Sequence, residues 1–330
     1  MKIILTIIFL GISIFGTDPI ALAAEQTPET FNQWKNTLKQ EIQAQGLSEQ
    51  AAQHFIESLH YIKRVIELDR RQPEGTMTHE EYLKKVIPES KVKAARAAYK
   101  ANKKLLKAAE SESGVAAKFI VALWGKETHF GKVTGNYHVP SALATLAFDG
   151  RRASFFKKEL LAAAKIIGEG HIELEQMKGS WAGAMGNCQF MPSSFLRYAV
   201  DANNDGKKDI WGDKEDIFAS MANYLRESGW QSDETWGRQV KLTQPFTAYQ
   251  FGKAHRQSLN AWQQQGVRRA DLSDLPQTDM QAYLISPGGE NGRIYLVYDN
   301  FDVLMRWNRS HYFATGVGYL ADRVGYPKID

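Results

Sequence analysis

The chain is nearly without cysteine: Cys188 is the only one among 330 residues. One cysteine cannot form an intramolecular disulfide, and none lies near the N-terminus to accept a lipid. An exported protein of this composition must therefore be stable through its hydrophobic core alone, which roughly 300 residues can supply. We assign Cys188 itself no role.

Long hydrophobic runs are also missing. The longest apolar stretch, residues 3–15, is shorter than the roughly 20 residues that a membrane-spanning helix needs. Lys2 precedes it and Ala21-Leu22-Ala23 follows, a pattern typical of a secretory signal with a small-residue cleavage site. An uncleaved membrane anchor is the alternative. We predict a signal peptide over residues 1–23 and a soluble, periplasmic protein without a lipid anchor.

No charge of one sign dominates: 41 Lys and Arg face 37 Asp and Glu, for a net charge of +4. Removal of residues 1–23 takes away Lys2 and Asp18, one of each sign, and leaves this balance unchanged. Lysines are frequent over residues 84–107, but they and the single aromatic residue among them form no recognised nucleic-acid-reading motif. A solvated helix face explains them better, and no nucleic-acid partner is expected.

One carboxylate stands out on an apolar helix predicted for residues 115–131. Val115, Phe119, Leu123 and Glu127 recur at every fourth position, so Glu127 points where the helix packs. Burial against apolar side chains raises the pKa of a carboxyl group and prepares it as a general acid. A structural ion pair or helix-end role for Glu127 is an equally good reading of this segment alone.

The rest of the chain is predicted to be mainly helical. Thr30 with Gln33 forms a candidate capping box, Ser48 is a candidate cap, and a long helix is expected after Pro88. The residue pattern changes from helical to strand-like beyond Trp230. Short β-type runs at 238–243, 281–286 and 293–298, with a helix near 247–265, predict a small β-rich unit over residues 231–300.

Residues 179–194, GSWAGAMGNCQFMPSS, have three glycines among their first eight positions. Small residues let the backbone approach a ligand closely, and Ser193 or Ser194 is positioned to cap the helix that follows. A binding-cleft wall and a tight packing turn between helices are both consistent with this segment.

Residues 201–216, DANNDGKKDIWGDKED, match the first half of an EF-hand loop. Asp201, Asn203 and Asp205 alternate before Gly206, as in loops that wrap calcium. The second half departs, because Gly212 stands where a bidentate glutamate is expected. A predicted calcium site would therefore use Asp201, Asn203, Asp205, the carbonyl of Lys207 and a late carboxylate, with Asp213, Glu215 and Asp216 as the candidates. The alternative is a polar surface turn.

Together these segments resemble the lytic murein transglycosylase B family. The matching stretches are WGKETHFG (124–131), ALATLAFDGRRASFF (142–156), GSWAGAMGNCQFMPSS (179–194), the loop 201–216, ANYL around Tyr224, and DRRQPE (69–74). They follow one another along nearly the whole mature chain.

The resemblance implies an α+β, mainly α fold with a lysozyme-like helical core. It implies an N-terminal helical domain at 24–112, a catalytic core at 113–230, the β-rich unit at 231–300 and a helical return to the core at 301–330. Peptidoglycan glycan strands would be the substrate, with no cofactor needed for the chemistry. Cell-wall remodelling proteins are conceivable partners, and nothing demands more than a monomer.

For the chemistry, the resemblance implies that Glu127 acts first as acid and then as base. It would protonate the glycosidic oxygen between N-acetylmuramic acid and N-acetylglucosamine, then accept the proton of the C6 hydroxyl that attacks the anomeric carbon. A 1,6-anhydromuramyl end would result. Intramolecular attack, or help from the substrate acetamido group, replaces the second carboxylate that most glycosidases need.

Six further residues are implied to line the cleft. Ser180, Gln189 and Tyr224 are expected to donate hydrogen bonds to the sugars. The late aromatic residues of the family correspond here to Trp307, Tyr312 and Phe313. Trp307 and Phe313 stand where relatives often carry tyrosine, so they keep a stacking surface and lose the hydroxyl, and no hydrogen-bonding role is carried over to these two positions.

Two other readings stay open. A lysozyme-like hydrolase would need a second carboxylate opposite Glu127; Asp149 is the nearest candidate in sequence, although Arg151 and Arg152 suggest a structural pairing for it. A non-catalytic wall-binding protein would hold glycan in the same cleft without turnover.

Overall fold

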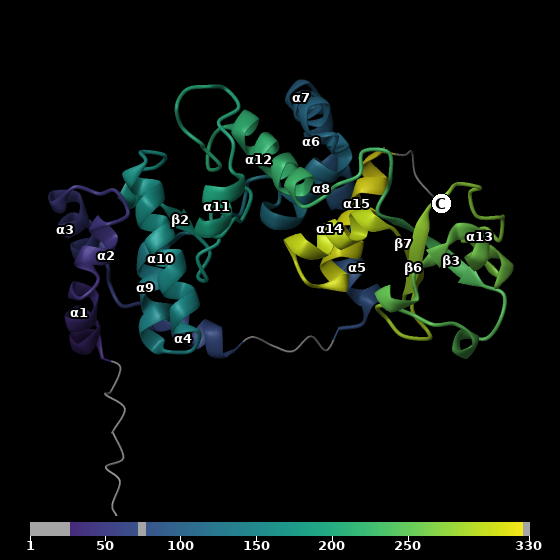
Figure 1. The fold of residues 1–330 in the computed structure, drawn as a ribbon, viewed down its shortest axis with the longest axis horizontal. Coiled ribbons are helices and arrows are strands. Elements are labelled where there is room, and N and C mark those ends of the chain that lie inside the picture. Colours follow the sequence, from purple (N-terminus) through teal and green to yellow (C-terminus); the bar gives the residue numbers. More distant parts are fainter. Residues whose placement is uncertain (1–26, 72–76, 326–330) are drawn as a thin grey trace, which may run out of the picture.

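The computed structural model describes residues 27–71 and 77–325. The predicted signal peptide lies outside these residues, as does most of the segment between Gln72 and Met77. Within the described ranges, no helix combines the length and the apolar character needed to cross a membrane. Figure 1 shows an elongated molecule, with helices along most of its length and a small sheet at one end.

The first group of helices packs around α9 (Val139–Asp149) and α10 (Ala153–Gly168). It comprises α1 (Pro28–Asn36), α2 (Lys39–Gln43), α3 (Glu49–Ser58) and α4 (Lys63–Arg70). The prediction that Ser48 caps a helix is confirmed. The capping box predicted at Thr30 and Gln33 is wrong, because Thr27 caps α1 and Thr30 is its partner. Pro28 favours the earlier start, since its fixed φ suits the first helical position.

The second group surrounds the buried helix α8 (Ala117–Thr128). Its other members are α5 (His79–Val86), α6 (Glu89–Ala101), α7 (Lys103–Ser113), α12 (Lys214–Glu227), α14 (Asp299–Trp307) and α15 (His311–Gly325). The long helix predicted after Pro88 breaks at Asn102, whose side chain donates to the Ala98 carbonyl. Helices from residues 24–112 are thus divided between the two groups. The domain boundaries predicted at residues 112, 230 and 300 stay a prediction.

The segment between the two groups is mostly irregular. It holds the ladder of β1 (Tyr137–His138) with β2 (Lys178–Gly179), the 3-10 turn η1 (Leu174–Gln176) and α11 (Pro192–Tyr198). Neither Ser193 nor Ser194 caps α11, contrary to the prediction. The helix begins at Pro192, and the backbone N–H and hydroxyl of Ser193 donate to the buried Glu159 instead.

The β-rich unit is a five-stranded antiparallel sheet in the order β4-β6-β7-β3-β5. The three predicted strands are confirmed as β3 (Gly237–Leu242), β6 (Gln281–Ile285) and β7 (Ile294–Val297). Two short strands, β4 (Gln257–Ser258) and β5 (Val267–Arg269), complete the edges, and two or three residues are too few to show an alternating pattern.

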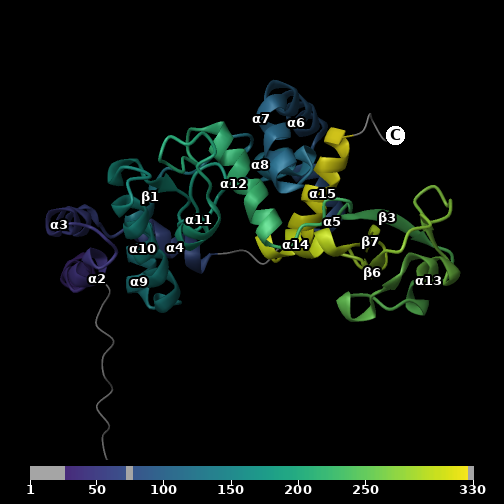
Figure 2. The ribbon, with the colours of Figure 1, turned by 45° about the horizontal axis from the view of Figure 1, so that its top comes forward.

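The helix predicted near 247–265 is shorter in the structure. It consists of two 3-10 turns, η2 (Phe246–Ala248) and η3 (Lys253–His255), followed by α13 (Leu259–Gln264). The unit has its own hydrophobic core around Trp262, Tyr298 and Leu284. The chain then enters α14 and α15, which return to the second helix group, as Figure 2 shows.

Candidate active site

Glu127 lies in the last turn of α8, directly after a fully apolar stretch. Residues 119–125 of this helix are all buried, whereas Glu127 is half-buried at its end. Gly125 is required by this packing: a Cβ there would lie 2.6 Å from the ring of Phe130, which folds back over the helix. The helix therefore delivers one carboxylate from a dry core to a partly open surface.

The turn after α8 is strained. His129, Phe130 and Gly131 all have left-handed backbone conformations, with φ of 52°, 62° and 81°. Only glycine adopts this region freely, and each of the other two residues costs roughly 1–2 kcal/mol. The Phe130 ring is held edge-on against Trp124, and Trp124 donates to the buried Asn187 at 2.7 Å. Packing on the core side thus fixes the end of the helix that carries Glu127.

The indole Nε1–H of Trp307 donates to Oε1 of Glu127 at 2.6 Å. Trp307 ends α14, so the far end of the chain supplies this contact. Loss of the tyrosine hydroxyl at this position therefore does not remove a hydrogen-bonding role. A tryptophan lacks the hydroxyl of tyrosine, but its indole nitrogen is also a hydrogen-bond donor.

Burial raises the pKa of Glu127 to about 7, against the lowering effects of the Trp307 hydrogen bond and the Lys126 charge. The direction agrees with the position of Glu127 on the apolar helix. Among the described residues, no second carboxylate contributes to this shift. A carboxyl group with this pKa is partly protonated at neutral pH, so it can give a proton and later take one back.

Lys126 is the charged neighbour of the Glu127 carboxylate. Its ammonium donates to the Tyr82 hydroxyl at 2.6 Å and lies over the rings of Tyr82 and Phe313. Burial and the charge of Lys91 lower the pKa of Lys126 to about 8. Burial and the Glu127 carboxylate raise the pKa of Tyr82 to about 12. Helices α5, α8 and α15 therefore converge here.

An aromatic cluster packs against Trp307. The ring of Tyr224 lies 4.6 Å from the ring of Trp307 and that of Phe190 5.4 Å from it. Phe190 was not among the predicted cleft residues, although it directly follows Gln189 in the glycine-rich segment. The Tyr224 hydroxyl donates to the Arg306 carbonyl, so its proton is engaged within the protein.

The remaining predicted cleft residues are placed by their own local contacts. Gln189, with φ of 50°, donates through Nε2 to the carbonyls of Thr134 and Gly186. The hydroxyl oxygen of Ser180 accepts from the Ala184 N–H. Tyr312 donates to a backbone carbonyl beside α5 and packs on Tyr82. These contacts leave the carbonyl oxygen of Gln189 and the proton of Ser180 for a ligand.

Asp149, the candidate second carboxylate, is an ion-pair partner of Arg70 at 2.8 Å. The expected structural pairing of Asp149 is confirmed, with Arg70 as a partner, while Arg151 and Arg152 both bind the buried Asp69 of α4. The stretches DRRQPE (69–74) and ALATLAFDGRRASFF (142–156) therefore each supply an aspartate to the other's arginines. These ion pairs join α4 to the turn between α9 and α10.

The loop 201–216 presents hard oxygen donors, but they bind backbone N–H groups. Asp201 accepts from Asp205 and Gly206, and Asp205 accepts from Lys207. Asp216 accepts from the N–H groups of Ala202 and Asp209, and burial raises its pKa. No group of three or more histidine, cysteine, aspartate or glutamate side chains is arranged to hold a metal within the described ranges. The donor chemistry suits calcium, whereas the arrangement of these carboxylates does not yet form a site.

A family model described as "Transglycosylase SLT domain" matches residues 30–322. The chain belongs to this family of transglycosylases. Membrane-bound lytic murein transglycosylase B from Escherichia coli K12 is 32% identical over 229 residues, which cover 66% of this chain. The match spans 59% of that relative, less than two thirds of its length.

Solved transglycosylase structures match along most of the fold. SltB3 from Pseudomonas aeruginosa in complex with NAG-NAM-pentapeptide has a TM-score of 0.86 and 37% identity, covering 90% of this chain and 80% of that one. The E. coli lytic transglycosylase Slt35 in complex with calcium has a TM-score of 0.75 and 28% identity, covering 91% and 93%. The predicted family and the predicted fold class, mainly helical and of the lytic transglycosylase type, are confirmed.

Proposed function

We propose that this protein is a lytic transglycosylase that cleaves the β-1,4 bond between N-acetylmuramic acid and N-acetylglucosamine in peptidoglycan. The single observation that carries this proposal is the environment of Glu127. One half-buried carboxyl group with a pKa near 7 stands at the end of a buried helix, and no second carboxylate is among the groups that shift its pKa. Family membership supplies the class of bond.

Glu127 serves in turn as general acid and general base. In its protonated form it gives its proton to the glycosidic oxygen of the departing N-acetylglucosamine. As carboxylate it then accepts the proton of the muramyl C6 hydroxyl, whose oxygen attacks the anomeric carbon and closes a 1,6-anhydro ring. The nucleophile belongs to the substrate, so no water and no second carboxylate are needed. Trp307 stabilises the ionised form through its N–H.

The six other predicted cleft residues position the sugars. Ser180 donates through its free proton, whereas Gln189 offers its carbonyl oxygen, since both of its N–H protons are engaged. Tyr224, Trp307 and Phe190 form an aromatic wall for sugar faces. Tyr312 and Phe313 act on the opposite side, where Phe313 lies beneath the Lys126 ammonium.

The test is mass spectrometry of the muropeptides released from purified peptidoglycan. Anhydromuramyl products from the wild-type protein, and none from Glu127→Gln, are expected. Reducing-end products, one water heavier, would instead identify a hydrolase with a second catalytic group. Binding of the glycan without any product would identify a non-catalytic wall-binding protein.

The loop 201–216 is proposed to bind a structural calcium ion. The related E. coli transglycosylase Slt35 has been solved in complex with calcium, and Asp201, Asn203, Asp205 and Asp216 offer oxygen donors here. Binding requires these side chains to exchange backbone N–H partners for the ion. The ion would tie the loop together and supply no step of the reaction.

We propose that this chain is exported, that residues 1–23 are cleaved off, and that the mature protein is soluble in the periplasm. The substrate proposed above lies in that compartment, and the leading residues have the composition of a signal peptide. N-terminal sequencing of the protein from a periplasmic extract tests it: Ala24 as first residue is expected, and a first residue of Met1 would contradict it.

A further inference from the structure

A cavity of about 630 Å³ lies where the β-rich unit meets the second group of helices. Strands β3 and β7 form one side of it, and helices α5 and α15 form the other. It is separate from the site at Glu127, since none of the predicted cleft residues lines it. We name it the junction cavity, and its polar lining includes Arg238, Arg293, Tyr295, Tyr319, Asp322 and Arg323.

The alternation of side chains along β7 brings polar groups to this cavity. Leu296 packs in the core of the β-rich unit, whereas Tyr295 belongs to the core formed with the helices. Arg293 is two residues before Tyr295 and shares its side of the strand. On α15, Tyr319 and Arg323 are four residues apart and therefore lie on one face. One face of a strand and one face of a helix thus supply the lining.

Two buried hydrogen-bond donors in this lining have no partner among the described residues. They are the hydroxyl of Tyr295 and the Nε–H of Arg323. Tyr295 is only 2% exposed, and burial raises its pKa against the nearby charge of Arg293, so the hydroxyl keeps its proton. The other nitrogens of Arg323 are engaged, because they donate to Tyr319 at 2.9 Å and to Glu89 at 2.6 Å. A buried donor without an acceptor is unfavourable, and here two of them line one cavity.

Tyr319 brings the two sides of the cavity together. The guanidinium groups of Arg293, beside β7, and Arg323, on α15, lie 5.5 and 5.7 Å from the centre of its ring. An anion held near this ring is therefore within reach of donors from both elements. Charge-assisted hydrogen bonds of this kind are among the strongest that side chains make.

The charge of the lining favours an anion. Three arginines, Arg238, Arg293 and Arg323, face two carboxylates, Glu80 and Asp322, which leaves one net positive charge. One glutamate and one lysine that pair with these groups from outside the lining cancel each other. Both carboxylates are already engaged, since Glu80 accepts from Arg293 at 2.5 Å and Asp322 accepts from an indole N–H at 3.0 Å. Arginine stays protonated and has no acceptor, so its free N–H calls for an acceptor oxygen.

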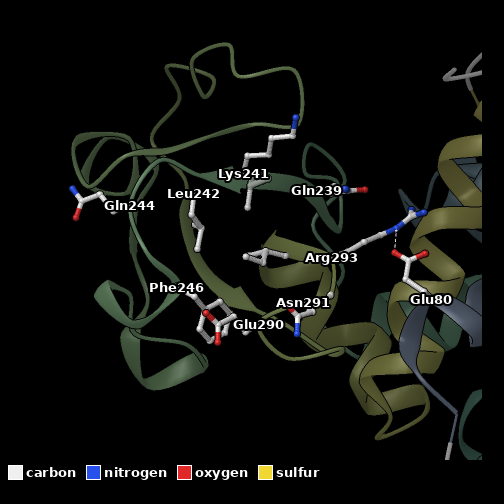
Figure 3. Close-up of a pocket in the computed structure, with 12 residues that line it drawn as sticks. Glu80, Gln239, Lys241, Leu242, Gln244, Phe246, Glu290, Asn291 and Arg293 are labelled. Atoms are coloured by element: carbon white, nitrogen blue, oxygen red, sulfur yellow. Dashed lines mark hydrogen bonds and ion pairs between the residues drawn. The ribbon is translucent and has the colours of Figure 1, made fainter.

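A neighbouring hollow of about 590 Å³ on the sheet, shown in Figure 3, differs in both respects. It shares the Arg293–Glu80 ion pair with the junction cavity. Its own lining adds Lys241 and Glu290, so its charges balance. None of its side chains is among the buried groups that lack a partner in the described ranges. The unmet donors are therefore a property of the junction cavity and not of the whole sheet face.

We infer that the junction cavity binds a small ligand through an oxyanion, a carboxylate or a phosphate group, which accepts hydrogen bonds from the Tyr295 hydroxyl and from Nε of Arg323. The planar fork of arginine matches both anions, and the volume lies in the range of small-molecule sites. Because the donors come from β7 and α15, the ligand fastens the β-rich unit to the helices. The inference goes beyond the proposed reaction and does not depend on it.

The experiment is a calorimetric titration of the full protein at constant ionic strength with two probes, inorganic phosphate and succinate, and with sodium chloride as the reference. Tyr295→Phe removes the unpartnered hydroxyl and keeps the ring. Arg323→Lys keeps the positive charge and removes the Nε–H. Tyr283→Phe is the matched control, because Tyr283 is a buried tyrosine on the neighbouring strand β6, does not line the cavity, and donates its hydroxyl proton to Asp302.

The wild type is expected to bind at least one probe at a single saturable site. Tyr295→Phe should weaken this binding about 10-fold or more, as loss of a hydrogen bond to a charged group would. Arg323→Lys should weaken it as well, and Tyr283→Phe should leave it unchanged. Binding of phosphate alone assigns a phosphate-bearing ligand, and binding of succinate alone assigns a carboxylate. No saturable binding of either probe, or equal affinities of the wild type and Tyr295→Phe, would overturn the inference.

Melting curves separate binding from folding. Without an oxyanion, Tyr295→Phe should melt at the temperature of the wild type or above it, since the lost hydroxyl has no partner in the described fold. The probe that binds should raise the melting temperature of the wild type, because a ligand of the folded state stabilises it, and should raise that of Tyr295→Phe less. A rise of equal size in the two proteins would place the probe elsewhere and reject the junction cavity as its site.

Discussion

The indole nitrogen of Trp307 lies 2.6 Å from Oε1 of Glu127, across 180 residues of sequence. The contact forms because the β-rich unit is followed by α14, which returns to α12 and the core. An N–H donor favours the carboxylate over the neutral acid, so it opposes the effect of burial. The pKa of Glu127 is thereby a balance between burial, which raises it, and the Trp307 hydrogen bond together with the Lys126 charge, which lower it.

Trp307→Phe tests this balance directly. The substitution keeps an aromatic ring and removes the N–H, so the pKa of Glu127 should rise above its value of about 7. A hydrogen bond to a charged group contributes about 1.5–3 kcal/mol, which corresponds to a rise of about 1–2 pH units. The limb of the pH–rate profile that reports Glu127 should move to higher pH.

The control for this prediction is Trp34→Phe, which changes a tryptophan of α1 that packs on Phe31 and Phe148, in the other helix group. Its pH–rate profile should match that of the wild type. A Trp307→Phe profile that moves toward lower pH, or stays in place while the rate falls, would show that the indole N–H does not act on Glu127.

The local part of this site could be predicted from the sequence, and the distant part could not. The four-residue spacing of Val115, Phe119, Leu123 and Glu127 depends on one helix, and helix α8 has the predicted burial. The observed bounds of α8 also agree within two or three residues with the predicted range. Periodicity reports one face of one element, and this face is what raises the pKa of Glu127.

Contacts between segments that are distant in the sequence produce no periodic pattern from which they could be predicted. The donor on Trp307 was visible in the side chain itself, but its partner depends on how the chain returns after the sheet. The pairing of Arg151 and Arg152 with Asp69 shows the same limit, since Asp149 is closer in sequence. Proximity along the chain is a poor guide when ion pairs join separate helices. The short strands β4 and β5 also lacked enough residues to show a pattern.

The Asp69 cluster should support the fold and not the chemistry. Asp69 is 2% exposed, and it holds Arg151 at 2.7 Å and Arg152 at 3.2 Å. Asp69→Asn removes the charge while keeping the shape, leaving two arginines without their partner. Because both arginines are half exposed, solvent screens part of the loss, and we expect destabilisation of about 1–3 kcal/mol.

Urea unfolding of Asp69→Asn measures this effect. Glu67→Gln on the same helix is the control, since Glu67 has an exposed pairing with Arg64 that solvent screens, and this variant should leave the urea midpoint nearly unchanged. The turnover of folded Asp69→Asn should stay near that of the wild type. A stable but inactive variant would mean that this cluster acts on the active site.

Calcium should stabilise the protein if the loop 201–216 binds it. Removal of the ion with a chelator is expected to lower the melting temperature, and added calcium should restore it, because a ligand that binds only the folded state stabilises it. Asp205→Ala should abolish the shift. Lys207→Ala should retain it, since only the backbone carbonyl of that residue is proposed as a ligand. A wild-type melting temperature that changes with neither chelator nor added calcium would exclude a structural ion.

Glu127→Gln should lose turnover by several orders of magnitude and gain stability in a defined range of pH. In the wild type, the raised pKa of Glu127 means that the folded protein holds this proton more tightly than the unfolded chain, whose carboxyl has a pKa near 4.5.

Below pH 4.5 the Glu127 carboxyl is protonated in both the folded and the unfolded wild type, and its burial costs little. As the pH rises from 4.5 to 7, ionisation favours the unfolded chain, and above pH 7 the full penalty applies. Glutamine never ionises, so the variant should unfold at about the same temperature as the wild type at about pH 4 and at a higher one at about pH 8. The difference corresponds to about 1–3 kcal/mol. A variant that is less stable than the wild type at the higher pH would show that ionised Glu127 is well solvated or paired, and would remove the physical basis for its role as an acid.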